Sequence, residues 1–143
     1  MSANYKQLTE FQKKIEQLNN QQKEEFLESC CKELAARLLA KVIKRTPSDS
    51  GTLRRGWTAG KNQNASAYAN SLEIRKVGDK YHIDIINPVE YASYVEYGHR
   101  TANHTGWVSG KFMLTISESE LNNMSDAILQ KKLNKFMKDV FDT

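Results

Sequence analysis

The fold is decided by two short stretches of this sequence, TPSDSGTLRRGW at residues 46–57 and VEYASYVEYGHRT at residues 89–101. The first begins with Pro, Ser, Asp and Gly, which favour a turn. We expect this turn to lead into a strand over residues 53–59. That strand would share three side chains on one face: Leu53, Arg55 and Trp57. The second stretch predicts two helical turns that end at Gly98.

Around these stretches, apolar residues recur every three or four positions, a spacing that indicates amphipathic helices. The pattern over residues 26–43 predicts a long helix that ends near Arg45, because a proline two residues later disfavours the helical state before it. Residues 1–19 carry a similar, interrupted pattern and are predicted as a separate N-terminal helix. A final helix is expected to begin at Asn123, a favourable N-cap. The pattern leaves the state of residues 111–121 open.

A β-hairpin is predicted over residues 71–87, where Gly78 and Asp79 separate two apolar runs. A turn at this pair aligns three cross-strand pairs on one largely apolar face: Lys76 with Tyr81, Ile74 with Ile83, and Leu72 with Ile85. The other face would carry two polar pairs: Arg75 with His82, and Glu73 with Asp84. A slip of one residue would scatter the isoleucines over both faces, so the pattern specifies the register.

Together these elements predict an α+β fold. A long N-terminal helix and a C-terminal helix would pack on a small antiparallel β-sheet that includes the hairpin. With 143 residues the chain is long enough for one hydrophobic core, so residues 1–143 are predicted to form a single domain. Residues 60–70 and 99–110 show no core-forming pattern and are expected to be mobile loops.

The formal net charge of +4 is concentrated over residues 37–55. Six basic residues lie in that region: Arg37, Lys41, Lys44, Arg45, Arg54 and Arg55. Such a cluster permits contact with nucleic acid or with an acidic protein, although a solvated helix face is the commoner meaning of a charged run. No apolar run approaches the roughly 20 residues that span a bilayer, so no membrane partner is expected. The polar N-terminus and the adjacent Cys30 and Cys31, which cannot easily bridge, indicate a reducing cytosolic compartment.

No catalytic, cofactor or metal site is predicted. His99 and His104 share a loop, but His82 lies on the hairpin, and the sequence offers no further ligand at the short spacing that zinc prefers. A metal-dependent enzyme built on the His99/His104 loop is therefore a distant alternative. Glu90 and Glu96 are interpreted as ordinary surface carboxylates, because at six residues apart they do not share a helix face.

The aromatic residues are the remaining candidates for a functional surface. Three tyrosines recur every third residue and two tryptophans lie in turn-like segments: Tyr91, Tyr94, Tyr97, Trp57 and Trp107. Core packing would explain each ring. A subunit interface, where Tyr, Trp and Arg are enriched, is the alternative. Stacking on single-stranded nucleic acid is a third reading, which Arg54, Arg55 and Trp57 fit loosely.

The order of three motifs resembles a family of small tailed-phage proteins known as tail-completion, neck or head–tail connector proteins. The matching residues form a proline-to-arginine turn, a tyrosine-rich turn and an aromatic-Met-Leu segment: Pro47, Asp49, Gly51, Leu53, Arg54; Tyr91, Ala92, Tyr94, Val95, Glu96, Gly98; and Phe112, Met113, Leu114. The resemblance covers roughly residues 30–141. The chain departs from it at Gly98-His99 and Lys111-Phe112, where many members have Gly-Thr and then Pro-Phe.

The resemblance implies an α+β virion protein without catalysis, made in the host bacterial cytoplasm. It implies a homo-oligomeric ring of about six subunits at the head-proximal end of the tail, in contact with neighbouring neck and tail proteins and with passing phage DNA. The candidate residues for the subunit interface or the DNA channel are Arg54, Arg55, Trp57, Tyr91, Tyr94, Tyr97 and Trp107. The alternative is a small nucleic-acid-binding protein that uses the basic region 37–55.

Overall fold

The computed structural model describes residues 20–47 and 51–141, so the expected N-terminal helix over residues 1–19 lies outside the described part. Two long helices, α2 (Asn20–Arg45) and α6 (Met113–Phe141), flank a series of shorter elements. These are α3 (Thr52–Gly56), α4 (Ala65–Ser71), β1 (Arg75–Val77), β2 (Lys80–His82), α5 (Ala92–Tyr97), β3 (Gly98–Arg100) and β4 (Trp107–Ser109). The described part is α+β and mostly helical, which confirms the expected class.

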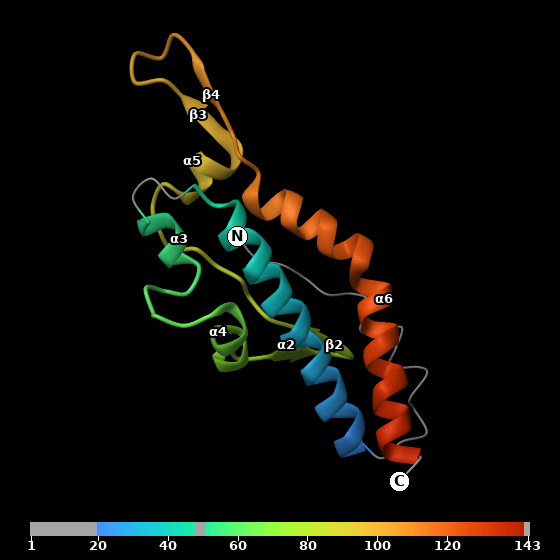
Figure 1. The fold of residues 1–143 in the computed structure, drawn as a ribbon. Helices are drawn as coiled ribbons and strands as arrows, with labels where there is room; N and C mark the ends of the chain where they lie inside the picture. The colour runs from blue at the N-terminus through green and yellow to red at the C-terminus, as the bar shows by residue number, and fades with distance from the viewer. Residues whose placement is uncertain (1–19, 48–50, 142–143) are drawn as a thin grey trace.

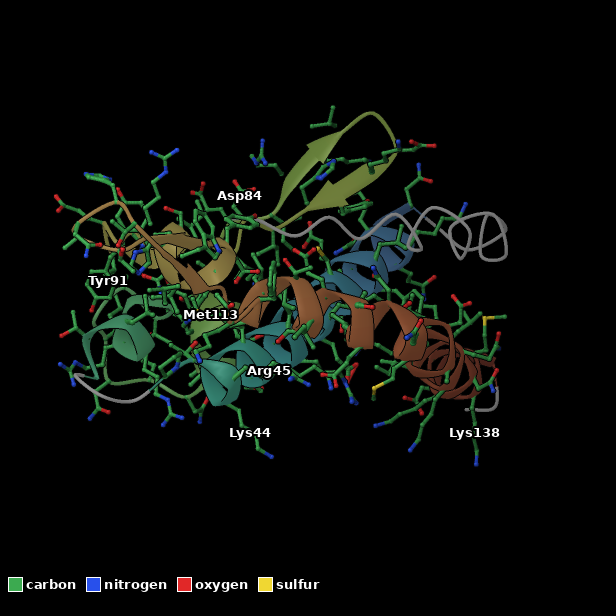
Figure 2. All side chains as sticks on the ribbon, turned by 90° about the horizontal axis from the view of Figure 1, so that it is seen from above. Lys44, Arg45, Asp84, Tyr91, Met113 and Lys138 are labelled. Atoms are coloured by element: carbon green, nitrogen blue, oxygen red, sulfur yellow. The ribbon has the colours of Figure 1, made fainter. Side chains whose placement is uncertain are left out.

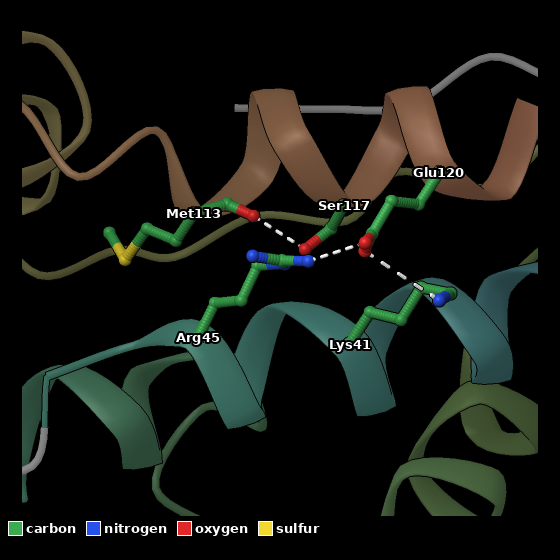
Figure 3. Close-up of polar contacts among 5 residues, drawn as sticks. All are labelled: Lys41, Arg45, Met113, Ser117 and Glu120. Carbon is green, nitrogen blue, oxygen red and sulfur yellow. Dashed lines mark hydrogen bonds and ion pairs between the residues drawn. The ribbon is translucent and has the colours of Figure 1, made fainter.

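Helices α2 and α6 lie side by side and run in opposite directions (Figure 1). At one end Phe26 stacks on Phe136 with ring centroids 4.4 Å apart. At the other end Glu120 accepts a hydrogen bond from Arg45 at 2.5 Å and lies 3.7 Å from the Lys41 ammonium (Figure 3). The predicted end of the long helix at Arg45 is confirmed.

The hydrophobic core lies between α2 and the segments that cover it. Nine residues of α2 are buried, which is one continuous face of the helix: Phe26, Leu27, Cys30, Cys31, Leu34, Ala35, Leu38, Leu39 and Val42. Complete burial of a leucine or isoleucine side chain contributes roughly 1.5–3 kcal/mol, so this face organises the domain. Burial also raises the pKa of Cys30 and of Cys31 to about 12, which keeps both thiols protonated and inert.

The register predicted for the hairpin is confirmed where its strands pair. Strands β1 and β2 are antiparallel, with Lys76 opposite Tyr81 and Arg75 opposite His82. The ladder is shorter than expected and does not extend to Ile83. The alternation nevertheless continues, because Tyr81, Ile83 and Ile85 are buried while the residues between them are not. This apolar face packs toward α2 as predicted.

The strand predicted over residues 53–59 is wrong, because residues 52–56 form helix α3. Leu53 and Trp57 are both buried, and a spacing of four places two side chains on one face of a helix as well as of a strand. The exposure of Arg55 distinguishes the two, since a strand would have turned it inward with its neighbours. Gly51 starts the helix from a left-handed conformation with φ of 73°.

The prediction of loops over residues 60–70 and 99–110 is only partly right, because each segment also contains regular secondary structure. Helix α4 occupies the end of the first segment, because the Asn64 side chain accepts a hydrogen bond from the Ala67 N–H at 2.8 Å and caps it. The second segment holds the antiparallel pair β3–β4. The described residues therefore contain two separate two-stranded sheets in place of the single small sheet expected.

Helix α6 begins at Met113, ten residues before the predicted cap at Asn123. The sequence before Met113 supplies no residue that could cap the helix locally, since Lys111 and Phe112 precede it. The acceptor comes from a distant part of the chain, and it belongs to the candidate site.

Candidate functional site

The candidate site is a projecting hairpin built on α5. Strands β3 and β4 extend away from the body of the molecule, and α5 lies at their base (Figure 1). The pairing sets Gly98 opposite Ser109, His99 opposite Val108 and Arg100 opposite Trp107. Large apolar side chains on α5, on the hairpin and directly before α6 remain in solvent, and together they are called the aromatic arm: Tyr94, Tyr97, Trp107, Val108 and Phe112.

Two glycines allow the hairpin to close against α5. At Gly98, where φ is 87°, a Cβ atom would lie 2.5 Å from the Val108 carbonyl oxygen and 2.8 Å from the Trp107 indole nitrogen. At Gly110 a Cβ would lie 2.4 Å from the Glu96 carbonyl oxygen. No side chain fits at either position, so the two chain segments cross at backbone contact and the Trp107 indole lies beside Gly98.

The loop between β3 and β4 is held by its own hydrogen bonds. The Asn103 side-chain oxygen accepts hydrogen bonds from the Thr101 hydroxyl at 2.7 Å and from the Thr105 hydroxyl at 2.7 Å. The Gly106 N–H donates to the Thr101 hydroxyl at 3.1 Å, and the Thr101 N–H donates to the Gly106 carbonyl at 3.0 Å. These bonds give the tip of the projecting hairpin a defined shape in the single chain.

Glu96 fastens the aromatic arm to α6. Its side chain is fully buried, and its carboxylate accepts hydrogen bonds from the backbone N–H groups of Leu114 and Thr115, both at 2.9 Å, and from the Thr115 hydroxyl at 2.6 Å. A carboxylate at a helix N-terminus satisfies donors that have no partner within the helix, and it also meets the positive end of the helix dipole. Glu96 is therefore the distant cap of α6.

The interpretation of Glu96 as a surface carboxylate is therefore wrong. Sequence spacing alone gave no reason to bury it, because its partners lie 18 and 19 residues further along the chain. One signal could have found it. The start of α6 lacks a local cap, and an uncapped buried helix terminus requires an acceptor from elsewhere. The other carboxylate of that pair, Glu90, is exposed as predicted.

The tyrosines and Trp107, which the sequence suggested as interface residues, lie at the surface. Tyr94, Tyr97 and Trp107 are 60%, 57% and 61% exposed, and Tyr91 is less so. The Tyr94 ring also meets the His99 ring at 5.5 Å between centroids, which joins α5 to β3. These rings occupy one end of the molecule, where a partner could cover them.

Trp57 does not belong to this surface. It is fully buried, and its indole N–H donates a hydrogen bond of 2.8 Å to the Thr46 hydroxyl. The same hydroxyl donates to the Val42 carbonyl at 2.6 Å. Trp57 thus closes the core at the C-terminal end of α2, because its apolar ring is covered while its one polar atom is satisfied. A contact between Trp57 and another subunit or DNA is excluded in the folded monomer.

The two predicted arginines have different surroundings. Arg54 is half-buried and donates hydrogen bonds to the carbonyl oxygens of Thr46 at 3.0 Å and Lys44 at 3.4 Å, so its guanidinium caps the end of α2. Arg55 is exposed, with its guanidinium beside Gly51. Only Arg55 of the two is presented to a partner, and neither belongs to the aromatic arm.

The fold partly neutralises the basic region 37–55. Arg37 pairs with Glu33 at 3.7 Å, and Glu120 of α6 pairs with both Lys41 and Arg45. The hydrogen bond from Arg45 and the positive charges beside it lower the pKa of Glu120, which keeps this carboxylate ionised. Glu33 and Glu120 therefore offset part of the positive charge expected here from the sequence, and within the described residues Lys44 and Arg55 make no ion pair.

The histidines do not assemble a metal centre in the described part of the chain. His99 Nδ1 lies 2.7 Å from the Arg100 carbonyl oxygen, within its own strand. Within residues 20–47 and 51–141, no three His, Cys, Asp or Glu side chains gather as metal ligands do. The alternative of a metal-dependent enzyme gains no support from this geometry.

None of the described helices is long and apolar enough to cross a membrane.

Comparison with known families identifies the chain. The model of a family described as "Bacteriophage HK97-gp10, putative tail-component" matches residues 9–98, which is more than half of the sequence. The chain belongs to this family. The matched range contains the stretch 46–57 and the tyrosine-rich turn as far as Gly98. No curated protein and no solved structure matches it.

Membership of the HK97-gp10-like family confirms the resemblance to phage tail and neck proteins. The structure shows what three residues of the matching motifs do. Gly51 begins α3, Leu53 enters the core and Glu96 caps α6. The match to the HK97-gp10-like model ends at Gly98, where the projecting hairpin begins. Most of the aromatic arm therefore follows the part of the chain that defines the family match.

Proposed function

We propose that this protein is a structural subunit of a phage particle that acts in tail completion or head–tail joining, without enzymatic activity. In this proposal it assembles with copies of itself into a ring, for which six subunits is the expectation, and the ring contacts neighbouring neck and tail proteins. The proposal is supported by the match to a phage tail-component family. The observation that carries the assembly step is the exposed aromatic arm.

The aromatic arm has the properties of a subunit contact. Tyr and Trp are enriched among residues that dominate binding energy at interfaces, and exposed apolar patches on soluble domains mark interaction sites. Three of its rings are more than half exposed. An isolated two-stranded hairpin is only marginally stable in water, yet this one is held by Glu96 and by a hydrogen-bonded tip. It is therefore a preformed projection, which reduces the ordering cost of binding.

The position of the arm suits a ring. A ring requires a heterologous interface, in which one patch of a subunit meets a different patch on its neighbour. A projection at one end of an elongated molecule meets this requirement, because it reaches the body of the next copy while its own body receives the arm of the previous one (Figure 1). We therefore place the aromatic arm at the contact between successive subunits.

The test compares wild-type protein with the double variant Tyr97→Ser/Trp107→Ser. Mass is measured by light scattering, for each protein alone and after mixing with phage tails that lack this protein. We expect the wild type to bind tails and to form rings, alone or on the tail, and the double variant to lose ring formation. Each substitution replaces a solvent-exposed ring, so the monomer should remain folded. Its circular dichroism spectrum should match that of the wild type.

Val77→Ser is the matched control, because Val77 is 60% exposed and lies on β1, outside the aromatic arm. It should assemble as the wild type does. Normal ring formation by the double variant would refute the role of the aromatic arm. If the wild-type protein did not bind tails and stayed monomeric, the proposed function itself would be refuted.

A further inference from the structure

A second surface of the molecule carries a concentration of positive charge that the proposed function does not use. Two adjoining grooves run along α2, one of about 440 Å³ beside α6 and one of about 610 Å³ beside α4. They share Glu33, Arg37 and Lys132 as lining residues. We call them together the basic groove.

The charge of the basic groove is strongly unbalanced. Its lining contains five cations and one carboxylate: Lys32, Arg37, Lys131, Lys132, Lys135 and Glu33. Glu33 is shared, at 3.7 Å from Arg37 and 3.3 Å from Lys132. Lys131 and Lys135 make no ion pair within the described residues. The net charge of this lining equals the +4 of the whole chain.

The cations form a row along α6. Lys131 and Lys135 are four residues apart and therefore lie on one helix face, with Cβ atoms about 6 Å apart. Lys138 continues the row one turn later and points away from the body of the molecule (Figure 2). Ala127 and Ile128 form an apolar floor beside them, along which lysine stems can lie while the ammonium groups stay in water.

The chemistry of this lining fits the phosphodiester backbone of a nucleic acid. Lysine ammonium groups are compact point charges that suit phosphate oxygens. The lining contains no aromatic ring on which a base could stack. Its apolar members are mainly small alanines, which offer no deep pocket for the anchor side chains of a bound peptide helix. We propose that the basic groove binds the phosphodiester backbone of duplex DNA without reading its sequence.

Of the six basic residues in region 37–55, where the sequence alone placed a nucleic-acid contact, the basic groove contains one, Arg37. Lys44 lies eleven residues beyond Glu33 on α2, or about 16 Å along the helix axis. Glu120 pairs with Lys41 and Arg45 and offsets one of their two positive charges. The two locations can therefore be distinguished by substitution.

The experiment measures fluorescence anisotropy of a short labelled DNA duplex as protein is added, at several salt concentrations. Neutralisation of about four phosphates predicts a slope of log affinity against log salt near −3.6, or about a 150-fold loss between about 50 and 200 mM salt. The variant Lys131→Gln/Lys135→Gln removes two contacts, so its slope should be about −1.8 and its loss about 12-fold. The matched control Lys44→Gln/Arg55→Gln removes the same charge and should keep the wild-type slope.

Three results would overturn the proposal. The first is an unchanged slope in the Lys131→Gln/Lys135→Gln variant, provided that circular dichroism shows it folded. The second is a larger effect from the Lys44→Gln/Arg55→Gln control, which would return the contact to region 37–55. The third is tighter binding of a poly-glutamate peptide than of duplex with the same number of charges, which would make an acidic protein segment the partner.

Discussion

Replacement of Glu96 by glutamine should destabilise the protein by about 2 kcal/mol. The carboxylate accepts three hydrogen bonds, from the Leu114 and Thr115 N–H groups and from the Thr115 hydroxyl. A glutamine turns an NH₂ group toward these donors, so at least one buried donor loses its acceptor, at about 1–3 kcal/mol. The lost charge at the helix N-terminus costs roughly 0.3–2 kcal/mol more. Easier desolvation of a neutral amide offsets part of this sum.

The measurement is urea unfolding followed by far-UV circular dichroism, with the melting temperature as a second readout. For a chain of this size, a loss of about 2 kcal/mol corresponds to a fall of roughly 7 °C in Tm. The exposed Glu90 provides the control, because Glu90→Gln removes the same charge without a buried partner and should change stability by less than about 0.5 kcal/mol. If Glu96→Gln were no less stable than Glu90→Gln, the assignment of Glu96 as the cap of α6 would be refuted.

Two further substitutions test the base of the aromatic arm and its surroundings. Gly98→Ala should lower the free energy of unfolding in urea by about 3 kcal/mol, because its Cβ would lie 2.5 Å from the Val108 carbonyl oxygen at a positive φ. Gly78→Ala is the control, since Gly78 shares the positive φ but a Cβ there would meet open space. An equally large loss of stability in Gly78→Ala would contradict the steric explanation. Burial, and then the charge of Glu96, raises the pKa of Glu118, so the folded state favours its protonated form. Ionisation of Glu118 therefore removes stability as pH rises through that raised pKa, and Glu118→Gln should have a higher Tm than wild type at neutral pH. The difference should vanish below the ordinary pKa of 4.5, and a variant less stable at neutral pH would show that the raised pKa is wrong.

Elements set by local pattern were predictable from the sequence. The long helix ends at Arg45 because of the nearby proline, and the hairpin register follows from the alternation around Gly78 and Asp79. In both cases the determining residues are neighbours in the chain. The end of the tyrosine-rich helical turn at Gly98 was predictable for the same reason, since glycine adopts positive φ without steric cost.

The candidate site was only partly predictable. The tyrosines and Trp107 are exposed, as a contact surface requires, but Trp57 was placed on the same surface although it is buried against Thr46. An aromatic residue in a turn can face either way, and its burial depends on what packs above it. The sequence likewise placed the excess charge in region 37–55, where Glu120 from the distant helix α6 offsets part of it.

The sequence by itself determined the α+β class, the end of α2, the register of the first hairpin and the resemblance to the phage family, because each rests on the order and spacing of residues along the chain. Only the tertiary structure decided where α6 begins, which aromatic rings remain in solvent and where positive charge accumulates. Each of these depends on a contact between residues far apart in the chain. Glu96 capping Leu114 and Thr115 is the clearest case: a helix begins where a buried carboxylate from another element meets its unpaired N–H groups.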